Sequence, residues 1–174
     1  AVPVQAGGVE YPGIINITNG LYTNPFGRLN TVIVHEVGHQ WSFNLVGNDQ
    51  IEHPWLDEAM TQYLTLRYQE THENRFSQDY LDYWEQLWDT SQEPNTPIGL
   101  PVDSYNESSY GEIVYGKGLF FFEALAQKLG KEQLDEALKS YFANYAWKIA
   151  EPRDFQVSLE SNCTCDLGPL FKIW

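Results

Sequence analysis

Two histidines and a glutamate stand together in the sequence as His35-Glu36-Val37-Gly38-His39. Four residues make just over one turn of an α-helix, so in a helix His35 and His39 project from the same face. Two imidazoles on one face supply half of the ligands of a zinc site. Glu36 follows the first histidine directly, where it can reach a metal-activated water without binding the metal itself. This segment therefore predicts a metal site with its own general base.

A carboxylate further along the chain offers the third ligand that a catalytic zinc site requires. Residues 40–57, a gap of 18, separate His39 from Glu58. A set of two histidines and one glutamate leaves one metal position open for water. The motif also has a simpler interpretation, in which His35 and His39 lie on an exposed helix face. Glu58 also has a simpler interpretation, because the helix dipole favours a glutamate in the first turn of a helix.

The spacing of these residues resembles that of the gluzincin metallopeptidases, and among them the M1 aminopeptidase family. Residues 55–59 read Trp-Leu-Asp-Glu-Ala and are similar to the family's W-L-x-E-G-x-A block, with Ala59 in place of glycine. Residues 7–11 resemble the family's G-x-M-E-N segment, with Val9 for methionine and Tyr11 for asparagine. Residues 115–118 read Tyr-Gly-Lys-Gly and resemble the family's Y-E-K-G.

The resemblance implies a zinc peptidase with a role for each motif residue. His35, His39 and Glu58 would bind Zn²⁺, whose fourth position holds the attacking water. The metal would lower the pKa of this water towards about 7. Glu36 would take the proton of the water and pass it to the leaving amine as the peptide bond breaks.

The same resemblance implies that Glu10 binds the free amino group of the substrate and that Tyr115 donates a hydrogen bond to the oxyanion. Tyr110, five residues before Tyr115, falls where some members of the family carry a second active-site tyrosine. Each has an alternative: Glu10 could be a loop carboxylate, and the two tyrosines could be core aromatic residues. The function implied is a zinc-dependent aminopeptidase that removes amino-terminal residues from peptides.

Other functions remain open at this level. An endopeptidase would use the same zinc chemistry without needing Glu10. An isolated domain could bind zinc with little activity, because family members usually carry further domains around the catalytic one, and one branch of the family acts on a non-peptide substrate. We expect residues 1–174 to form one thermolysin-like catalytic domain, a fragment of a longer multidomain protein.

The composition restricts the partners of this chain. It has 174 residues and a formal net charge of −14. Such a charge argues against nucleic acid and anionic membrane surfaces, and it attracts cationic peptides and divalent metals. The sequence has no apolar run close to the ~18 to 20 residues that a membrane span requires. We therefore expect a peptide substrate, no nucleic acid and no membrane span; the oligomer and the compartment, cytoplasmic or exported, stay open.

Three residues outside the catalytic set carry expectations of their own. Gly38 weakens its helix by about 1 kcal/mol relative to alanine, and its missing side chain could allow a neighbouring element to approach closely. Asp57 could hydrogen-bond a metal-binding histidine or cap a helix. Cys163 and Cys165 are separated by a step of at most about 7 Å, which disfavours a bond between them, so two local thiols are predicted.

Periodicity and turn residues predict the elements that position these side chains. Residues 13–18 are rich in β-branched residues and favour a strand. A helix carrying the motif is expected over residues 29–46, with Gly47 as its C′ residue. Further helices are expected over residues 56–71, 76–88, 114–129, 132–145 and 152–160, with a long loop over 91–110. The fold class is α+β, mostly helical with a small N-terminal sheet, which resembles the thermolysin-like metallopeptidase fold.

Overall fold

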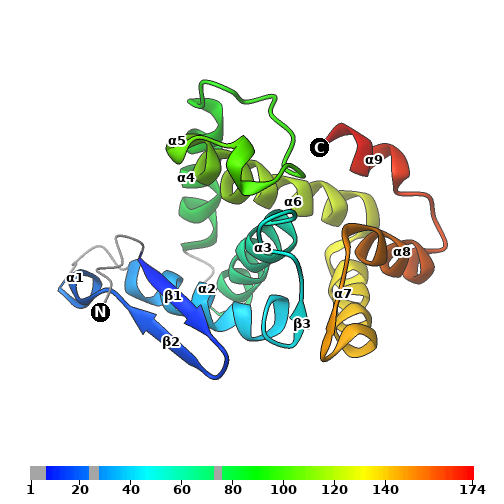
Figure 1. Ribbon diagram of the computed structural model, residues 1–174, viewed down its shortest axis with the longest axis horizontal. Helices are drawn as coiled ribbons and strands as arrows, with labels where there is room; N and C mark the ends of the chain where they lie inside the picture. Colours follow the sequence, from blue (N-terminus) through cyan, green and yellow to red (C-terminus); the bar gives the residue numbers. More distant parts are fainter. Residues whose placement is uncertain (1–6, 24–27, 73–75) are drawn as a thin grey trace.

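The computed structural model describes residues 7–23, 28–72 and 76–174, and it begins with a small sheet (Figure 1). Strands β1 (Gly8–Tyr11) and β2 (Ile14–Ile17) form an antiparallel hairpin in which Glu10 lies opposite Ile15. Gly13 turns the chain between them with a φ of 75°, which costs glycine little. The strand predicted over residues 13–18 is therefore confirmed.

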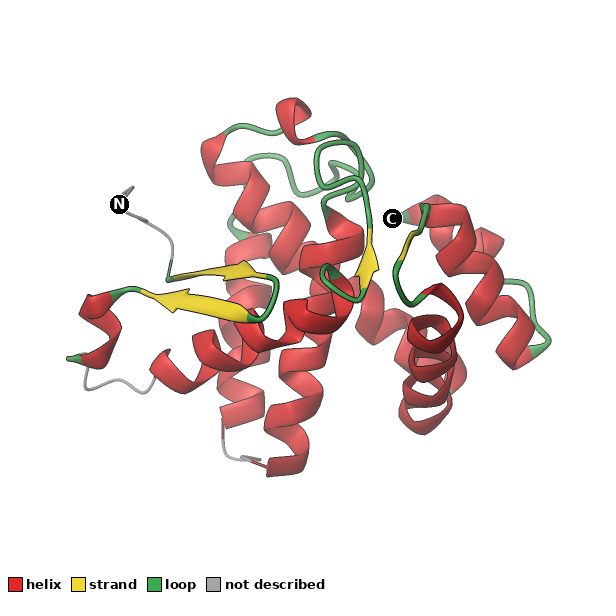
Figure 2. Cartoon of the chain, turned by 60° about the horizontal axis from the view of Figure 1, so that its bottom comes forward, coloured by secondary structure: helices red, strands yellow, loops and turns green. Residues whose placement is uncertain are grey.

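The hairpin lies along α2 (Arg28–Ser42), the helix that carries the His-Glu motif (Figure 2). One side chain fastens the two together. Nε2 of Gln40 donates to the carbonyl oxygen of Tyr11 at 3.1 Å, and its Oε1 accepts from the backbone N–H of Gly13 at 2.9 Å. A short helix, α1 (Asn19–Tyr22), links the hairpin to the segment before α2.

The central helix is α3 (Trp55–His72), which other elements surround (Figure 1). Its buried residues occupy nearly every side of the helix, so it shows little separation of apolar and polar faces. Against α2, the contact depends on Gly38: a Cβ atom there would lie 2.9 Å from Cγ2 of Thr61. The close approach expected at Gly38 is therefore present.

A second layer of helices encloses one side of α3. Helix α4 (Ser77–Asp89) packs against a π-helical segment, η3 (Gly111–Lys117), which continues directly into α6 (Gly118–Leu129). The helix predicted from residue 114 thus starts three residues earlier and in π form. Residues 91–110 are mostly loop, as predicted, but they also contain the 3₁₀ turn η2 (Val102–Ser104) and the short helix α5 (Glu107–Tyr110).

The C-terminal third adds α7 (Lys131–Tyr145), α8 (Pro152–Cys163) and α9 (Gly168–Ile173). A two-residue strand, β4 (Lys148–Ile149), pairs in parallel with β3 (Val46–Gly47). The mostly helical architecture with a small N-terminal sheet is as predicted. Within the described residues, the search for a helix of sufficient length and apolarity to cross a membrane finds none.

The end of the motif helix was predicted too late in the sequence. Helix α2 stops at Ser42, and Val46 and Gly47 belong to β3, so Gly47 is not its C′ residue. The carbonyl oxygen of His39 accepts from both the backbone N–H and the side-chain amide of Asn44, at 2.9 and 3.2 Å. This local hydrogen bonding ends the helix and releases the chain to pair with β4.

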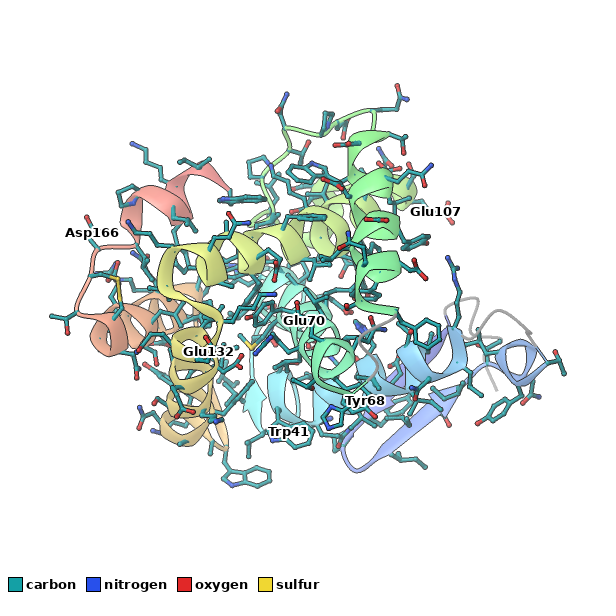
Figure 3. The ribbon with its side chains drawn as sticks, turned by 180° about the vertical axis from the view of Figure 1, so that it is seen from behind. Trp41, Tyr68, Glu70, Glu107, Glu132 and Asp166 are labelled. Atoms are coloured by element: carbon teal, nitrogen blue, oxygen red, sulfur yellow. A yellow bond between two sulfur atoms is a disulfide. The ribbon has the colours of Figure 1, made fainter. Side chains whose placement is uncertain are left out.

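The prediction of two local thiols was wrong, because Cys163 and Cys165 form a disulfide bond (Figure 3, yellow). Thr164 lies between them with a φ of 52° and a ψ of 41°, in the left-handed region. The bend leaves the two Cα atoms 5.2 Å apart, well within the range that disulfides use. The prediction failed because it considered the reach of an extended chain and not a turn.

Candidate metal centre and active site

Two helices bring three potential metal ligands together. His35 and His39 come from α2, and Glu58 comes from the first turn of α3. The two Nε2 atoms lie 3.1 Å apart. Oε2 of Glu58 lies 3.3 Å from Nε2 of His35 and 3.4 Å from Nε2 of His39. Ligands about 2.0 Å from a tetrahedral zinc lie about 3.3 Å from one another. The three atoms therefore have the spacing of three corners of one zinc site.

A buried carboxylate orients one of these histidines. Oδ1 of Asp57 lies 2.6 Å from Nδ1 of His39, and both side chains are 1% exposed. The other oxygen of Asp57 accepts from Nε2 of Gln50 at 2.6 Å. Burial alone would lower the pKa of His39, but hydrogen bonds to Asp57 and Glu58 raise it. With Nδ1 engaged in this way, Nε2 faces the other two ligands.

Glu36 lies beside this cluster and is nearly inaccessible to solvent. Its burial raises the pKa of its carboxyl to about 7, against the opposing effect of the two histidines. A carboxylate with a pKa near neutrality suits a general base. Strand β1 passes very close to it: a Cβ atom on Gly8 would lie 2.5 Å from Oε1 of Glu36. The Glu36 side chain can therefore occupy this place only because residue 8 is a glycine.

An aromatic stack leads away from the cluster. The ring of Tyr115 in η3 is stacked between His35, at a centroid distance of 5.9 Å, and Trp84 of α4, at 6.0 Å. Gly116 permits this packing, since a Cβ there would already approach the carbonyl oxygen of Trp84 to 3.3 Å. Burial and the negative charge of Glu58 hold the pKa of Tyr115 well above its usual value. The phenol thus remains protonated and can donate a hydrogen bond.

The two remaining candidate residues differ in position. Glu10 on β1 has a carboxylate oxygen within 4.8 Å of a ligand atom of both Glu36 and His39. Tyr110 contacts the ring of Tyr115 at 5.8 Å in a T-shaped arrangement and is itself part of the packing around α5. Burial raises the pKa of Tyr110. Glu10 therefore belongs to the cluster, whereas Tyr110 supports it from behind Tyr115.

One cavity of about 720 Å³ joins these side chains. Its described lining includes every candidate residue except Tyr110, namely Glu10, His35, Glu36, His39, Glu58 and Tyr115. Helix α4 adds a wall of aromatic side chains together with Asp79. The cavity thus brings together three potential metal ligands, one buried carboxyl group and one phenol hydroxyl.

Several residues of the site were not identified from the sequence. The sequence places Gly8 only within the motif at residues 7–11, and it predicts no role for Gln50 or Trp84. Gln50 and Trp84 act through their contacts with Asp57 and Tyr115, which come from other elements. The low side-chain volume of the Gly7-Gly8 pair was the one available signal, since paired glycines often mark a close backbone approach.

The sequence is similar to known proteins over most of its length. The sequence model described as "Peptidase family M1 domain" matches residues 13–174. Leucine aminopeptidase 2 of Candida albicans is 30% identical over 172 residues, which cover 86% of this chain and 27% of the relative. The leukotriene A-4 hydrolase homolog of Botryotinia fuckeliana is 29% identical over 161 residues, covering 88% of this chain and 25% of the relative. The chain thus spans about a quarter of the length of these relatives.

Solved structures share the fold. The M1 zinc metallopeptidase from Deinococcus radiodurans matches with a TM-score of 0.73 at 19% identity, over 99% of this chain and 37% of that one. Native leukotriene A4 hydrolase from Saccharomyces cerevisiae matches with a TM-score of 0.73 at 24% identity, over 98% of this chain and 28% of that one. At these identities the likeness shows the fold alone.

Proposed function

Because this chain belongs to peptidase family M1, we propose that it forms the catalytic domain of a zinc-dependent aminopeptidase that removes amino-terminal residues from peptides. The observation that carries this proposal is the convergence of His35, His39 and Glu58 to separations of 3.1 to 3.4 Å inside one cavity. The family's zinc fits these residues, since one carboxylate and two imidazole nitrogens are a known catalytic donor set. When bound, zinc supplies a Lewis acid that polarises the substrate carbonyl and acidifies water.

The protein's own groups perform the proton transfers. Glu36 accepts the proton of the attacking water and delivers it to the amine that leaves. Burial raises the pKa of this carboxyl, which favours both the uptake and the release of a proton. The hydroxyl of Tyr115 donates a hydrogen bond to the oxygen that gains negative charge during the attack. The stacking of Tyr115 between His35 and Trp84 holds this donor in place.

Selectivity for the amino terminus is assigned to Glu10. Its carboxylate lies on β1 beside Glu36, in a cavity whose described lining also holds Glu58 and Asp79. A substrate α-ammonium group placed here would gain an ion pair and reduce the repulsion among these carboxylates. An acetylated amino terminus carries no charge, so it would neither form this ion pair nor reduce this repulsion. The position of Glu10 thus supports an exopeptidase over an endopeptidase.

The experiment is hydrolysis of amino-acyl fluorogenic amides and of their acetylated forms, with the zinc content measured on the same sample. We expect one equivalent of zinc and cleavage of free-amine substrates only. Glu36→Gln should abolish turnover and keep the zinc. Glu132→Gln, on α7 (Figure 3), is the matched control and should change neither quantity. Cleavage of acetylated substrates would instead indicate an endopeptidase, and zinc with no cleavage of any substrate would contradict the proposed activity of this chain.

A further inference from the structure

The cavity continues past the metal ligands towards the N-terminal end of α2. Arg28, Thr31 and Val32 line it there, one to two helical turns before His35. Tyr83 of helix α4 lines the cavity beside them, since its ring centroid lies 4.6 Å from the Arg28 guanidinium. The site therefore has room for part of a substrate on the Arg28 side of the cluster.

The path of β1 gives this extension a direction. A Cβ on Gly7 would contact Val32, one on Gly8 would contact Glu36, and the carbonyl oxygen of Tyr11 is bound by Gln40. Strand β1 therefore runs alongside α2 in the same sense as the helix. Glu10 consequently lies beyond Glu36, towards the C-terminal end of α2. A peptide whose amino group meets Glu10 and whose first bond meets Glu36 would extend its remaining residues towards Arg28.

Arg28 differs in charge from the rest of the cavity. Among the described lining residues it is the one lysine or arginine, whereas four carboxylates line the same space. Its guanidinium lies 4.6 Å from the ring centroid of Tyr83, which supports one face of the group. The described residues provide no carboxylate that forms an ion pair with it. The N–H groups at the edge of a guanidinium match the two oxygens of a carboxylate.

We propose that Arg28 binds the free α-carboxylate of short peptides and so selects substrates by length, an inference that rests on the proposed aminopeptidase function. Glu36 and Arg28 are eight residues apart on α2, which corresponds to about 12 Å along the helix. An extended peptide covers about 3.3 to 3.6 Å per residue. Two to three residues after the cleaved bond bring the carboxylate within reach of the long arginine side chain. The preferred substrates are therefore peptides of about three to four residues.

The test compares Leu-Ala-Ala and Leu-Ala-Ala-Ala with their C-terminal amides, and with an octapeptide acid and its amide. Binding is measured by calorimetry on the zinc-loaded Glu36→Gln chain, which does not turn over. We expect the short acids to bind about tenfold more tightly than their amides, the factor for one good charge-assisted hydrogen bond. The octapeptide pair should show no such ratio, because its carboxylate would lie beyond Arg28. Equal binding of short acids and amides would overturn the proposal.

Two variants test whether Arg28 causes the preference for short acids. Arg28→Met, added to Glu36→Gln, should remove the preference for short acids and leave the affinity for amides unchanged. Arg153→Met, an exposed arginine on α8, is the control: it removes the same charge outside this cavity and should preserve the preference. Loss of the preference in both variants would mean long-range attraction by net charge and would contradict a contact at Arg28. Circular dichroism checks that both variants are folded.

This proposal and the aminopeptidase function can fail separately. Amino-acyl fluorogenic amides carry no α-carboxylate, so their cleavage does not depend on Arg28. If they are cleaved and the acid preference is absent, the role of Arg28 is refuted and the activity stands. If they are not cleaved while short acids bind through Arg28, the site binds peptides without the proposed turnover.

Discussion

Nδ1 of His39 lies 2.6 Å from Oδ1 of Asp57, and neither side chain is more than 1% exposed. The contact joins α2 to the residue immediately before Glu58, the proposed third metal ligand, so one carboxylate couples the positions of both helices. Partners of this kind around a metal-binding histidine fix its ring orientation and its tautomer, and their loss usually weakens metal binding 10–100-fold.

Asp57→Ala should therefore weaken zinc binding by about 10–100-fold, and Asp57→Asn by less, because an amide oxygen can still accept from Nδ1–H. Competition with a chelator of known zinc affinity measures the effect without any need for catalysis. Asp103→Ala, at an exposed position in η2, is the control and should leave the affinity unchanged. An unchanged affinity in Asp57→Ala would show that His39 is held by the remaining packing.

Activity should depend on pH through Glu36. Burial raises its pKa from 4.5 to about 7, so protonation disables the base as the pH falls. A bound cation nearby favours the charged carboxylate, so we expect kcat/KM to fall through an acid limb with its midpoint between these two values. Glu10 is one of the charges that raise this pKa, so Glu10→Gln should move the limb to lower pH. A flat profile between pH 4.5 and 7 would contradict Glu36 as the base.

Gly8→Ala should cost activity more than stability. A Cβ atom at Gly8 would meet the carboxylate of Glu36 at 2.5 Å, and the side chain of Glu36 must then move. A displacement of about 1 Å at a reacting group can cost about 10²-fold in rate. Kinetics and thermal melts should show a large fall in kcat with a small change in Tm. The control is Gly20→Ala, where the nearest atom is 4.0 Å away.

The two tyrosines should respond differently to loss of the hydroxyl. Tyr115→Phe removes the proposed oxyanion donor and should lower kcat by about 10²–10³-fold with little change in KM. Tyr110→Phe should change kcat only a few-fold, because Tyr110 contacts the ring of Tyr115 and is absent from the described lining of the cavity. Equal losses in the two variants would place both hydroxyls at the reaction.

Gly118→Ala tests the packing of α6 on the central helix. An added Cβ would lie 2.6 Å from Cβ of Ala59, the residue after the proposed ligand Glu58 on α3. Overpacking of this kind costs about 1–3 kcal/mol, so Tm should fall clearly. Gly111→Ala is the matched control within the same helical stretch, since a Cβ there meets nothing within 4 Å and Tm should hold.

The sequence predicted that three potential metal ligands come together because a zinc motif has fixed spacing along helices. His35 and His39 must share a helix face if the segment is helical, and Glu58 needs only a second helix to reach them. The main helices were also placed within a few residues of their observed ends. Apolar periodicity carries this information for the helices that have one apolar face.

The parts that were not predicted depend on contacts between distant segments. The end of α2 depends on the Asn44 side chain and on pairing between β3 and β4, which lie about 100 residues apart in the sequence. The left-handed Thr164 that allows the disulfide has no strong local signal. Arg28 belongs to no motif in the sequence. It lines the cavity together with residues of α4, and the sequence alone does not show that α4 lies opposite α2.

The π-helical segment η3 makes the site sensitive to the number of residues, and not only to their types. Each residue of a helix advances a side chain by about 100° around the axis. Loss or gain of a residue between Gly111 and Val114 would rotate Tyr115 by up to about that angle, unless the segment changed its helical form to absorb it. Its hydroxyl would then leave the cavity even though every catalytic residue is retained. The site therefore constrains the length of this segment as well as the identity of Tyr115.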